Sequence, residues 1–296
     1  MINNIKEAVG ITYNGKYISM KNVKIYSKNA TYQKFEVLKT NRNKRYKYNA
    51  FLVEGVRNIN EAIKNNWHII SFIYEDKRPI SAWAQSILKT IKTETNYLLP
   101  ADLMRDISGK EDTSEILAIV KMRDACLSEI ILPEIPLLAL FDRPSNKGNL
   151  GTIIRSCDSF GIDGLIITGH AVDLYDPNVI AASMGSFFRT PVVREVDNNN
   201  LFSYFEFLRH RYPGFQIVGT TAHKEKNIGE IDFTLPTILL IGNETDGLSK
   251  TLKECSDVLA TIPMSAKSSA SSFNVGCAAT VFFYEAVRQR TSVQGR

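Results

Sequence analysis

Three stretches in the C-terminal half of the chain put polar residues where an apolar, strand-length run has just ended. In the first, residues 149–155, a glycine-containing turn follows the run 137–141 and leads into a helix. The free N–H groups and the dipole at a helix N-terminus favour anions, and the rigid guanidinium of Arg155 suits a phosphate. This stretch therefore indicates phosphate binding, although a capped helix with an exposed arginine has the same pattern.

The second stretch, residues 242–248, combines two glycines with two acids after the apolar run 237–241. Gly242 permits a close approach of the backbone to a ligand. Glu244 and Asp246 are costly to bury unpaired, so they either face solvent or meet a hydroxyl or a cation. Taken alone, the pattern fits a ligand-binding turn and an acidic surface turn equally well.

The third stretch, residues 271–276, gathers serines and an asparagine before an apolar helix that continues through Tyr284. Ser272 is a good N-cap for that helix, and Asn274 is a poor helix former that hydrogen-bonds well. A helix cap explains these residues without any chemistry, so this stretch does not indicate a function by itself.

The elements around these stretches predict an α/β domain. The expected strands are 137–141, 164–168, 216–220, 237–241 and 258–262, and the expected helices follow Asn149, Pro177, Asn200, Gly247 and Ser271. Strand–helix alternation is typical of a mostly parallel sheet with helices on both faces. Such open sheets bind ligands at the carboxyl ends of their strands, where the three stretches are expected to lie.

The N-terminal half has a different pattern, and on that basis we divide the chain into four parts. Residues 31–124 form a compact α/β domain with expected strands at 51–53, 69–74 and 116–120 and helical spacing at 56–63 and 83–91. The other parts are an arm or short hairpin at 1–30, a proline-containing linker at 125–136, and the second domain at 137–296.

The N-terminal end is strongly basic. Residues 1–50 carry nine lysines and two arginines against two glutamates, in a chain whose net charge is +5. Lysine and arginine neutralise phosphates, and the interleaved aromatic rings can stack on bases, so this end indicates nucleic-acid binding. A solvated basic segment with some aromatics turned inward is the alternative. The cations concerned include Lys39, Arg42, Lys44, Arg45 and Lys47.

Composition disfavours several other classes of function. Neither the four cysteines nor the four histidines show metal-ligand spacing, so we expect no metal site. The Gly-x-Gly-x-x-Gly fingerprint is absent from the sequence, which argues against a nicotinamide-dependent oxidoreductase. No apolar run approaches the roughly 18 residues of a membrane span, and the N-terminus lacks the apolar core of a secretory signal, so we expect a cytoplasmic protein.

Taken together and in this order, the three stretches resemble the three sequence motifs of the SpoU–TrmH family of RNA ribose methyltransferases, which use S-adenosylmethionine (SAM). Asn149, Gly151 and Arg155 stand in the key places of the first motif. The similar segments are 142–161 for the first motif, 176–178 and 182–186 after the second strand, 242–248 for the second motif, and 262–264 with 272–275 for the third.

The first domain carries a resemblance of its own. Residues 38–45, 51–57 and 116–121 are similar to the ribosomal-protein-like RNA-binding domain that is often attached to this family. This resemblance implies RNA as the partner and adds Arg57 to the candidate RNA-binding residues.

For the second domain the resemblance implies a parallel sheet with a trefoil knot, SAM as the cofactor without a metal, and a homodimer. It implies that backbone groups near Gly242, Ile262 and Phe273 hold SAM, with Thr220 and Thr221 lining the same pocket. It also implies that the catalytic residues are Asn149, Arg155, Glu244, Ser272 and Asn274. Because a guanidinium keeps its proton in proteins, we expect Arg155 to grip a phosphate and polarise the ribose hydroxyl rather than act as a base.

The chain departs from the family's common residues at Thr245, Phe273 and Gly276, where Gly, Leu and Ser are usual. Phe273 and Gly276 are similar to the thiostrepton-resistance subgroup, which modifies large-subunit ribosomal RNA. We therefore expect methylation of a ribose 2′-hydroxyl in ribosomal RNA. A transfer-RNA methyltransferase and a catalytically silent RNA-binding protein are the alternatives.

Overall fold

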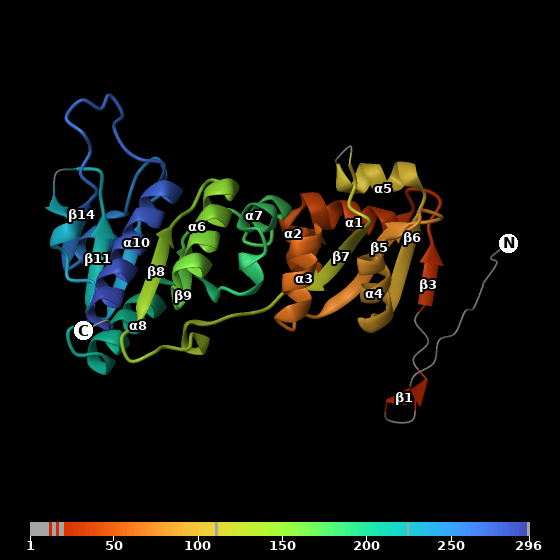
Figure 1. Ribbon diagram of the computed structural model, residues 1–296, viewed down its shortest axis with the longest axis horizontal. Coiled ribbons are helices and arrows are strands. Elements are labelled where there is room, and N and C mark those ends of the chain that lie inside the picture. The colour runs from red at the N-terminus through yellow and green to blue at the C-terminus, as the bar shows by residue number, and fades with distance from the viewer. Residues whose placement is uncertain (1–11, 14–15, 18–20, 110–111, 224, 295–296) are drawn as a thin grey trace. The chain divides into compact units, whose positions relative to one another are not determined.

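The computed structural model describes residues 12–13, 16–17, 21–109, 112–223 and 225–294. The chain divides into two compact units, Met1–Arg123 with Tyr175–Pro177, and Asp124–Leu174 with Asn178–Arg296. Each unit contains a sheet of its own (Figure 1). Much of the expected arm at 1–30 lies outside the described residues, but within it β1 (Thr12–Tyr13) pairs antiparallel with β2 (Lys16–Tyr17), as in a short hairpin.

The first unit is built on a five-stranded mixed sheet in the order β3-β6-β5-β7-β4. β7 runs antiparallel to β4 and β5, whereas β6 runs parallel to β3 and β5. The strands are β3 (Lys21–Lys24), β4 (Ala50–Glu54), β5 (Ile69–Glu75), β6 (Thr95–Leu99) and β7 (Ile116–Lys121). The helices are α1 (Ala30–Thr40), α2 (Arg42–Tyr48), α3 (Val56–Lys64), α4 (Ala82–Thr90) and α5 (Ala101–Ser108). The three expected strands and the two expected helices are thus confirmed.

Sequence reasoning missed α1 and α2 because their apolar residues are sparse among basic ones. In α1, Tyr32, Phe35 and Leu38 follow one another at intervals of three and are buried, which gives the helix a single narrow apolar face. The side-chain oxygens of Asn29 and Asn41 cap the two helices. Asparagine caps and a thin apolar stripe thus define helices that a search for dense periodicity overlooks.

The second unit is a seven-stranded sheet in the order β10-β9-β8-β13-β11-β14-β12, and its pairs are all parallel. The strands are β8 (Leu137–Asp142), β9 (Gly164–Thr168), β10 (Val192–Glu195), β11 (Gln216–Thr220), β12 (Lys226–Asn227), β13 (Thr237–Ile241) and β14 (Val258–Thr261). The five expected strands are confirmed. β10 and β12, at the edges, escaped prediction because β10 has only two apolar residues before Arg194 and Glu195, and β12 has only two residues.

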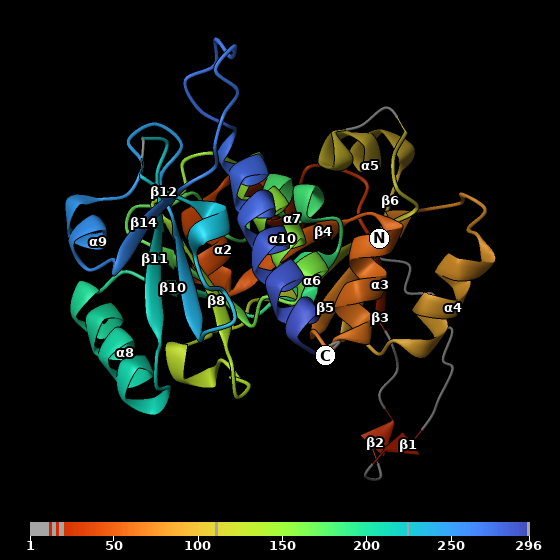
Figure 2. The same cartoon turned by 60° about the vertical axis from the view of Figure 1, so that its left-hand side comes forward.

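Helices cover both faces of this sheet, as the alternation of elements predicts. The helices of the unit are α6 (Lys147–Phe160), α7 (Pro177–Ser183), α8 (Asn198–Arg211), α9 (Lys250–Glu254) and α10 (Val275–Gln294). Leu138 and Leu140 of β8 belong to the same core cluster as Leu208 of α8. On the other face, α6 and α10 lie side by side (Figure 2), and the hydroxyls of Ser156 and Thr280 are 2.7 Å apart across them.

The start of α6 differs from the expectation in a way that bears on the site. The helix begins at Lys147 rather than after Asn149, because the side chain of Asn146 caps it by accepting from the Asn149 N–H at 3.0 Å. Further along, a Cβ atom at Gly151 would lie 2.5 Å from the Cβ of Ala182. Glycine at this position therefore allows α6 to pack tightly against α7.

The start of α10 corrects a second expectation. The helix begins at Val275, and the Oδ1 atom of Asn274 accepts from the N–H groups of Gly276 at 2.9 Å and Cys277 at 3.3 Å. Asn274 is therefore the cap, and it precedes the helix instead of lying in its first turn. Ser272 does not cap this helix, because it lies too far ahead of the first free N–H groups.

Candidate active site

The loops that follow β8 and β13 meet at the carboxylate of Glu244. Its oxygens accept hydrogen bonds from the N–H of Ser145 (3.0 Å), the hydroxyl of Ser145 (2.7 Å), the N–H of Asn146 (3.1 Å) and Nδ2 of Asn149 (3.2 Å). The side chain of Asp246, by contrast, is 70% exposed. Glu244 therefore binds the first loop through several hydrogen bonds, whereas the exposed Asp246 carboxylate lies 4.0 Å from the Arg143 guanidinium.

This arrangement keeps Glu244 ionised. Burial by itself would raise the pKa of the carboxyl group, but the hydrogen bonds donated by Ser145 and Asn149 hold the pKa of Glu244 below its ordinary value. The acid also lies beside the first residues of α6, where the helix dipole favours a negative charge. Glu244 is thus a fixed anion that accepts hydrogen bonds and does not donate them.

Asn149 connects Glu244 to the third stretch. Because its Nδ2 donates to Glu244, its Oδ1 is left to accept, and it does so from Nδ2 of Asn274 at 3.1 Å. Asn274 can donate this bond because its own Oδ1 is occupied by the N-terminus of α10. Three of the five candidate catalytic residues therefore form one chain of hydrogen bonds, and the carboxylate sets the orientation of both amides.

The second loop holds its shape through its own backbone. The N–H of Asn243 donates to the carbonyl of Gly247 at 3.0 Å, and the N–H of Gly247 donates back at 3.1 Å. A Cβ atom at Gly242 would lie 2.5 Å from the backbone nitrogen of Leu248, so the close approach expected of this glycine is made to the loop itself. Glycine is therefore needed at position 242 because the backbone of the loop itself packs against it.

Two residues that the sequence analysis did not nominate, Asp142 and Arg143, connect this loop to the sheet. Asp142 is buried at the end of β8 and accepts from the Arg143 guanidinium (2.9 and 3.1 Å), the hydroxyl of Thr168 (2.9 Å) and the N–H of Ser249 (2.8 Å). The hydrogen bond to Asp142 raises the pKa of Arg143. Arg143 also donates to the carbonyl of Gly247 at 3.1 Å. An acid at the last position of an apolar strand was the sequence signal for this cluster.

Arg155 and Ser272 stand outside the hydrogen-bonded chain. Arg155 lies on α6, one and two-thirds turns after Asn149 at about 3.6 residues per turn, and its side chain is exposed. Ser272 is exposed in the loop that joins β14 to α10. Within the part of the chain that the structure describes, neither side chain makes a hydrogen bond or ion pair, so both have polar groups available to a substrate.

The residues expected to hold SAM follow neighbouring strands. Gly242 comes directly after β13, Thr220 ends β11 and Ile262 comes directly after β14, and these three strands are adjacent in the sheet. Thr220, Thr221 and Ile262 are half-buried, and Phe273 is 45% exposed. Hydroxyls and backbone groups beside apolar side chains are the combination that orients a partly apolar cofactor, so these residues fit SAM.

In the first unit, some of the candidate RNA-binding residues present their charge to solvent. Lys47 and Arg57 are exposed, and Lys44 is half-buried. The guanidinium of Arg42 lies over the ring of Tyr46, 5.7 Å from its centre. A few residues away, Lys34 lies 4.9 Å from the centre of the Tyr48 ring, and both tyrosines are themselves exposed. Cations and aromatic rings thus alternate on this surface, as the composition indicates.

Arg45 and Lys39 differ from the expectation. Arg45 is only 1% exposed, and its guanidinium donates to the carbonyls of Leu38 (2.9 Å) and Lys39 (3.0 Å) and lies 3.5 Å from Asp176. The ammonium of Lys39 donates to the carbonyl of Ser108 at 3.0 Å. Both cations therefore satisfy carbonyl groups of their own unit. Sequence alone did not distinguish them from the exposed cations, because Asp176 and Ser108 are distant along the chain.

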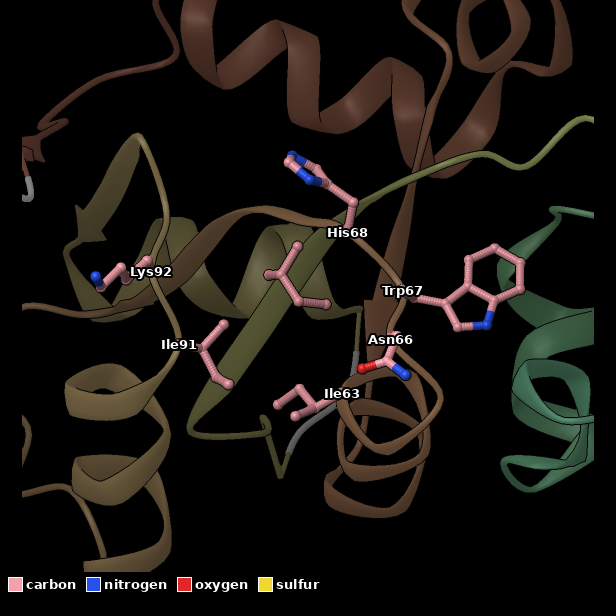
Figure 3. Close-up of a pocket in the computed structure, with 7 residues that line it drawn as sticks. Ile63, Asn66, Trp67, His68, Ile91 and Lys92 are labelled. Atoms are coloured by element: carbon pink, nitrogen blue, oxygen red, sulfur yellow. The ribbon is translucent and has the colours of Figure 1, made fainter. Parts of the chain in front are cut away.

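A surface depression of about 280 Å³ lies in the first unit. Its lining consists of Ile63, Asn66, Trp67, His68, Ile69, Ile91 and Lys92. The side chains of Trp67 and Lys92 point away from each other (Figure 3). Because a ligand site needs polar groups that converge, this depression is not a candidate for the SAM pocket.

Among the described residues, no helix combines the length and apolar character needed to cross a bilayer. Within the same ranges, His, Cys, Asp and Glu side chains do not gather in groups of three or more that could bind a metal ion.

Comparison with protein families settles the relationship of the chain. The SpoU rRNA methylase family matches residues 136–284, and the SpoU L30e-like domain matches residues 29–118. The chain belongs to the SpoU rRNA methylase family. Both halves of the expected resemblance, the methyltransferase domain and the ribosomal-protein-like domain attached to it, are thereby confirmed.

Among SpoU methylases, the chain is 42% identical over 270 residues to the 23S rRNA (uridine(2479)-2′-O)-methyltransferase of Streptomyces viridochromogenes, covering 91% of this chain and 93% of that relative. It is 28% identical to the 23S rRNA (guanosine(2553)-2′-O)-methyltransferase RlmP of Bacillus subtilis, covering 81% of this chain and 89% of the relative.

The fold agrees with a solved structure of a SpoU methylase. The crystal structure of AviRb from Streptomyces viridochromogenes in complex with AdoMet superposes with a TM-score of 0.81 at 42% identity, over 89% of this chain and 100% of that one. AdoMet is another name for SAM.

The departure at Thr245 leaves the SpoU loop intact. The N–H groups of Thr245 and Asp246 donate to Oδ1 of Asn243 at 2.8 and 3.2 Å, and Thr245 does not adopt a positive φ. A residue other than glycine is therefore accommodated at this point of the loop without backbone strain.

Proposed function

We propose that this chain transfers a methyl group from SAM to the 2′-hydroxyl of a ribose in ribosomal RNA. The observation that carries the proposal is the hydrogen-bonded chain of Glu244, Asn149 and Asn274, next to strand ends whose residues suit SAM. The name of the 42% identical relative, a 23S rRNA 2′-O-methyltransferase, supports both the reaction and the choice of ribosomal over transfer RNA.

Methyl transfer to oxygen is an in-line displacement at carbon. SAM supplies a methyl group on a sulfonium sulfur, and this sulfur takes the electron pair of the C–S bond as it breaks. The ribose 2′-oxygen forms the new C–O bond and gives up its proton to the surrounding water. The protein must therefore hold the 2′-oxygen in line with the methyl group, and positioning of this kind contributes on the order of 7 kcal/mol.

Arg155 supplies the positive charge at the ribose. Its exposed guanidinium matches the geometry of a phosphate group, so it binds the phosphate next to the target nucleotide. The same charge stabilises the negative charge that develops on the 2′-oxygen. The amides of Asn149 and Asn274 orient the ribose, and Ser272 offers a hydroxyl from the loop before α10.

Cations at the surface of the first unit supply affinity for RNA. Lys44, Lys47 and Arg57 neutralise phosphates, and Tyr46 and Tyr48 offer ring faces to unpaired bases. Arg45 does not take part, because its guanidinium is buried against carbonyl groups of the unit, and Lys39 uses one of its three donors on Ser108.

The working enzyme is a homodimer in this proposal. Cys277, Val281 and Tyr284 are exposed at helical spacing along α10, and an exposed apolar stripe of this kind is typical of a protein interface. Sedimentation equilibrium should give twice the mass of the chain for the wild type and a monomer for Tyr284→Glu. A wild type that stays monomeric at all concentrations contradicts the dimer.

Methyl transfer from SAM with a tritiated methyl group tests the function directly. The chain is incubated in parallel with large-subunit ribosomal RNA and with bulk transfer RNA, and isothermal titration measures SAM binding. We expect heat on SAM addition and label in ribosomal RNA. Label in transfer RNA alone identifies a transfer-RNA methyltransferase. RNA binding without SAM binding identifies a catalytically silent protein. The cytoplasmic location expected from the sequence stays a prediction.

A further inference from the structure

Arg143 adopts a backbone conformation that arginine rarely takes. It is the first residue after β8, and its φ is +47°, in the left-handed region that favours glycine. A non-glycine residue in this region costs on the order of 1 to 3 kcal/mol and persists only where surrounding contacts hold it. The contacts of Arg143 therefore indicate why the strain is present.

Those contacts connect Arg143 to both ends of the turn 243–247. The carbonyl of Arg143 accepts from Nδ2 of Asn243 at 2.7 Å, and its guanidinium donates to the carbonyl of Gly247 at 3.1 Å. The guanidinium is itself held by two hydrogen bonds to the buried carboxylate of Asp142. Its stem is confined as well, because a Cβ atom at Gly169 would lie 2.6 Å from Cγ of Arg143.

Glu244 lies between the two ends that Arg143 holds. The paired backbone hydrogen bonds of Asn243 and Gly247 maintain the shape of the turn without Arg143. What Arg143 adds is the position of the turn relative to β8, and hence the distance of the Glu244 carboxylate from Ser145 and Asn146.

We propose that Arg143 is a positioning residue for methyl transfer and that it acts through Glu244. By clamping the turn 243–247 to the end of β8, it sets the carboxylate against the start of α6 and thereby orients the amide of Asn149. This inference rests on the proposed function. It assigns to Arg143 no contact with SAM or RNA.

Arg143→Gly separates the guanidinium from the backbone. Glycine adopts a positive φ freely, so this variant keeps the backbone path and the carbonyl contact with Asn243. It removes the guanidinium contacts with Gly247 and with Asp142, which retains its hydrogen bonds from Thr168 and Ser249. We expect kcat to fall at least about 10-fold with the KM for SAM changed less than about 3-fold, because small misplacements of catalytic groups have effects of up to about 100-fold. Full activity in Arg143→Gly overturns the inference, since only the backbone conformation would then matter.

Arg209→Ala is the matched control. Arg209 lies 2.9 Å from Asp257, as Arg143 does from Asp142, and their side chains are 34% and 33% exposed. Asp257 also accepts a backbone hydrogen bond, from the N–H of Ile217. This pair lies at the opposite end of the sheet, so kcat of Arg209→Ala should stay within about 2-fold of the wild type, the usual range for a surface ion pair.

A double-mutant cycle shows whether Arg143 acts through Glu244. In a Glu244→Ala background, Arg143→Gly should reduce kcat by less than about 2-fold, because residues that act as one unit have non-additive effects. Losses that multiply would overturn the link to Glu244 and assign Arg143 a general structural role.

Amide hydrogen exchange gives a readout that does not need activity. The N–H groups of Ser145 and Asn146 donate to Glu244, so they should exchange faster in Arg143→Gly than in the wild type or in Arg209→Ala. Unchanged exchange at both amides contradicts the inference. A wild type that transfers no methyl group to any RNA refutes the proposed function, whereas the exchange experiment still tests the clamp.

Discussion

The two ends of the parallel sheet in the second unit use similar residues for different purposes. At the amino end, Arg290 of α10 donates to the carbonyls of Ile135 (2.7 Å), Phe233 (2.8 Å), Leu235 (2.9 Å) and Pro136 (3.1 Å). In α6, which begins at the carboxyl end, Arg155 is exposed and, among the described residues, has no such partner. Arg290 therefore uses its donors to hold the fold together, whereas the donors of Arg155 are available to a substrate.

The carboxylates of the two ends differ in the same way. Asp163 accepts from the N–H of Leu137, the first residue of β8, at 2.7 Å, and burial raises the pKa of Asp163. Glu244 gathers donors from a loop and a helix start, and these lower its pKa. The comparison teaches that Arg290 connects the loops before β8 and β13 and so contributes stability, whereas Glu244 orients the side-chain amide of Asn149 and so prepares chemistry.

Removing Arg290 should have the largest effect on stability. Arg290→Met leaves four carbonyl groups without their donor, and we expect the free energy of unfolding to fall by about 3 kcal/mol, since each unsatisfied buried group costs roughly 1 to 3 kcal/mol and water will reach some of them. Chemical denaturation measures the loss. Methyl transfer per folded molecule should stay unchanged, and a selective loss of turnover would break the comparison.

Removing Arg155 should instead lower activity and leave stability unchanged. Arg155→Ala should lower kcat at least about 100-fold, the usual scale for a positioned catalytic group, and leave SAM affinity and the unfolding temperature nearly unchanged. Steady-state kinetics, isothermal titration and thermal unfolding test the three parts. Turnover close to that of the wild type would remove Arg155 from the mechanism.

The first unit allows a smaller but sharper test of this comparison. Its surface lysines and the buried Arg45 are close together along the chain. Lys44→Gln with Lys47→Gln should weaken RNA binding and reduce the slope of log affinity against log salt by about 1 to 2. Arg45→Gln should destabilise the unit instead, since Arg45 is buried against carbonyl groups. A salt slope that changes for Arg45→Gln but not for the lysines would reverse the assignment.

The smallest expected effect concerns pH. Because the pKa of Glu244 is lower in the folded chain than in the unfolded one, the carboxylate stabilises the fold above its ordinary pKa and loses this contribution as pH falls through the lowered value. The stability difference between wild type and Glu244→Gln should therefore be constant above about pH 5 and shrink below it. Urea denaturation at several pH values measures it, and a difference that grows on acidification would contradict the lowered pKa.

Much of the second unit could be predicted from the sequence because its strands are continuous apolar runs. Buried parallel strands have this pattern, so β8, β9, β11, β13 and β14 were recognisable, and the polar residues after them could be grouped. Glu244, Asn149 and Asn274 were selected in this way, and the structure joins them.

The rest depends on contacts that sequence spacing does not reveal. In the sequence, Arg45 cannot be distinguished from the neighbouring exposed cations. Only the folded chain shows that Asp176 and the end of α1 bury it. Arg143 shows no sign of its role until the turn 243–247 folds back onto it. Ser272 and Asn274 are both plausible caps, and only the actual start of α10 distinguishes them. The trefoil knot that the family resemblance implies stays a prediction.

The position of the transferred methyl group tests the central claim most directly. Ribosomal RNA labelled by the chain with tritiated SAM is hydrolysed in alkali, which cleaves next to a free 2′-hydroxyl but not next to a methylated one. The account predicts that the label is recovered in a single alkali-resistant dinucleotide and that Arg155→Ala nearly abolishes it. Label recovered in single nucleotides, on a base, would contradict the account.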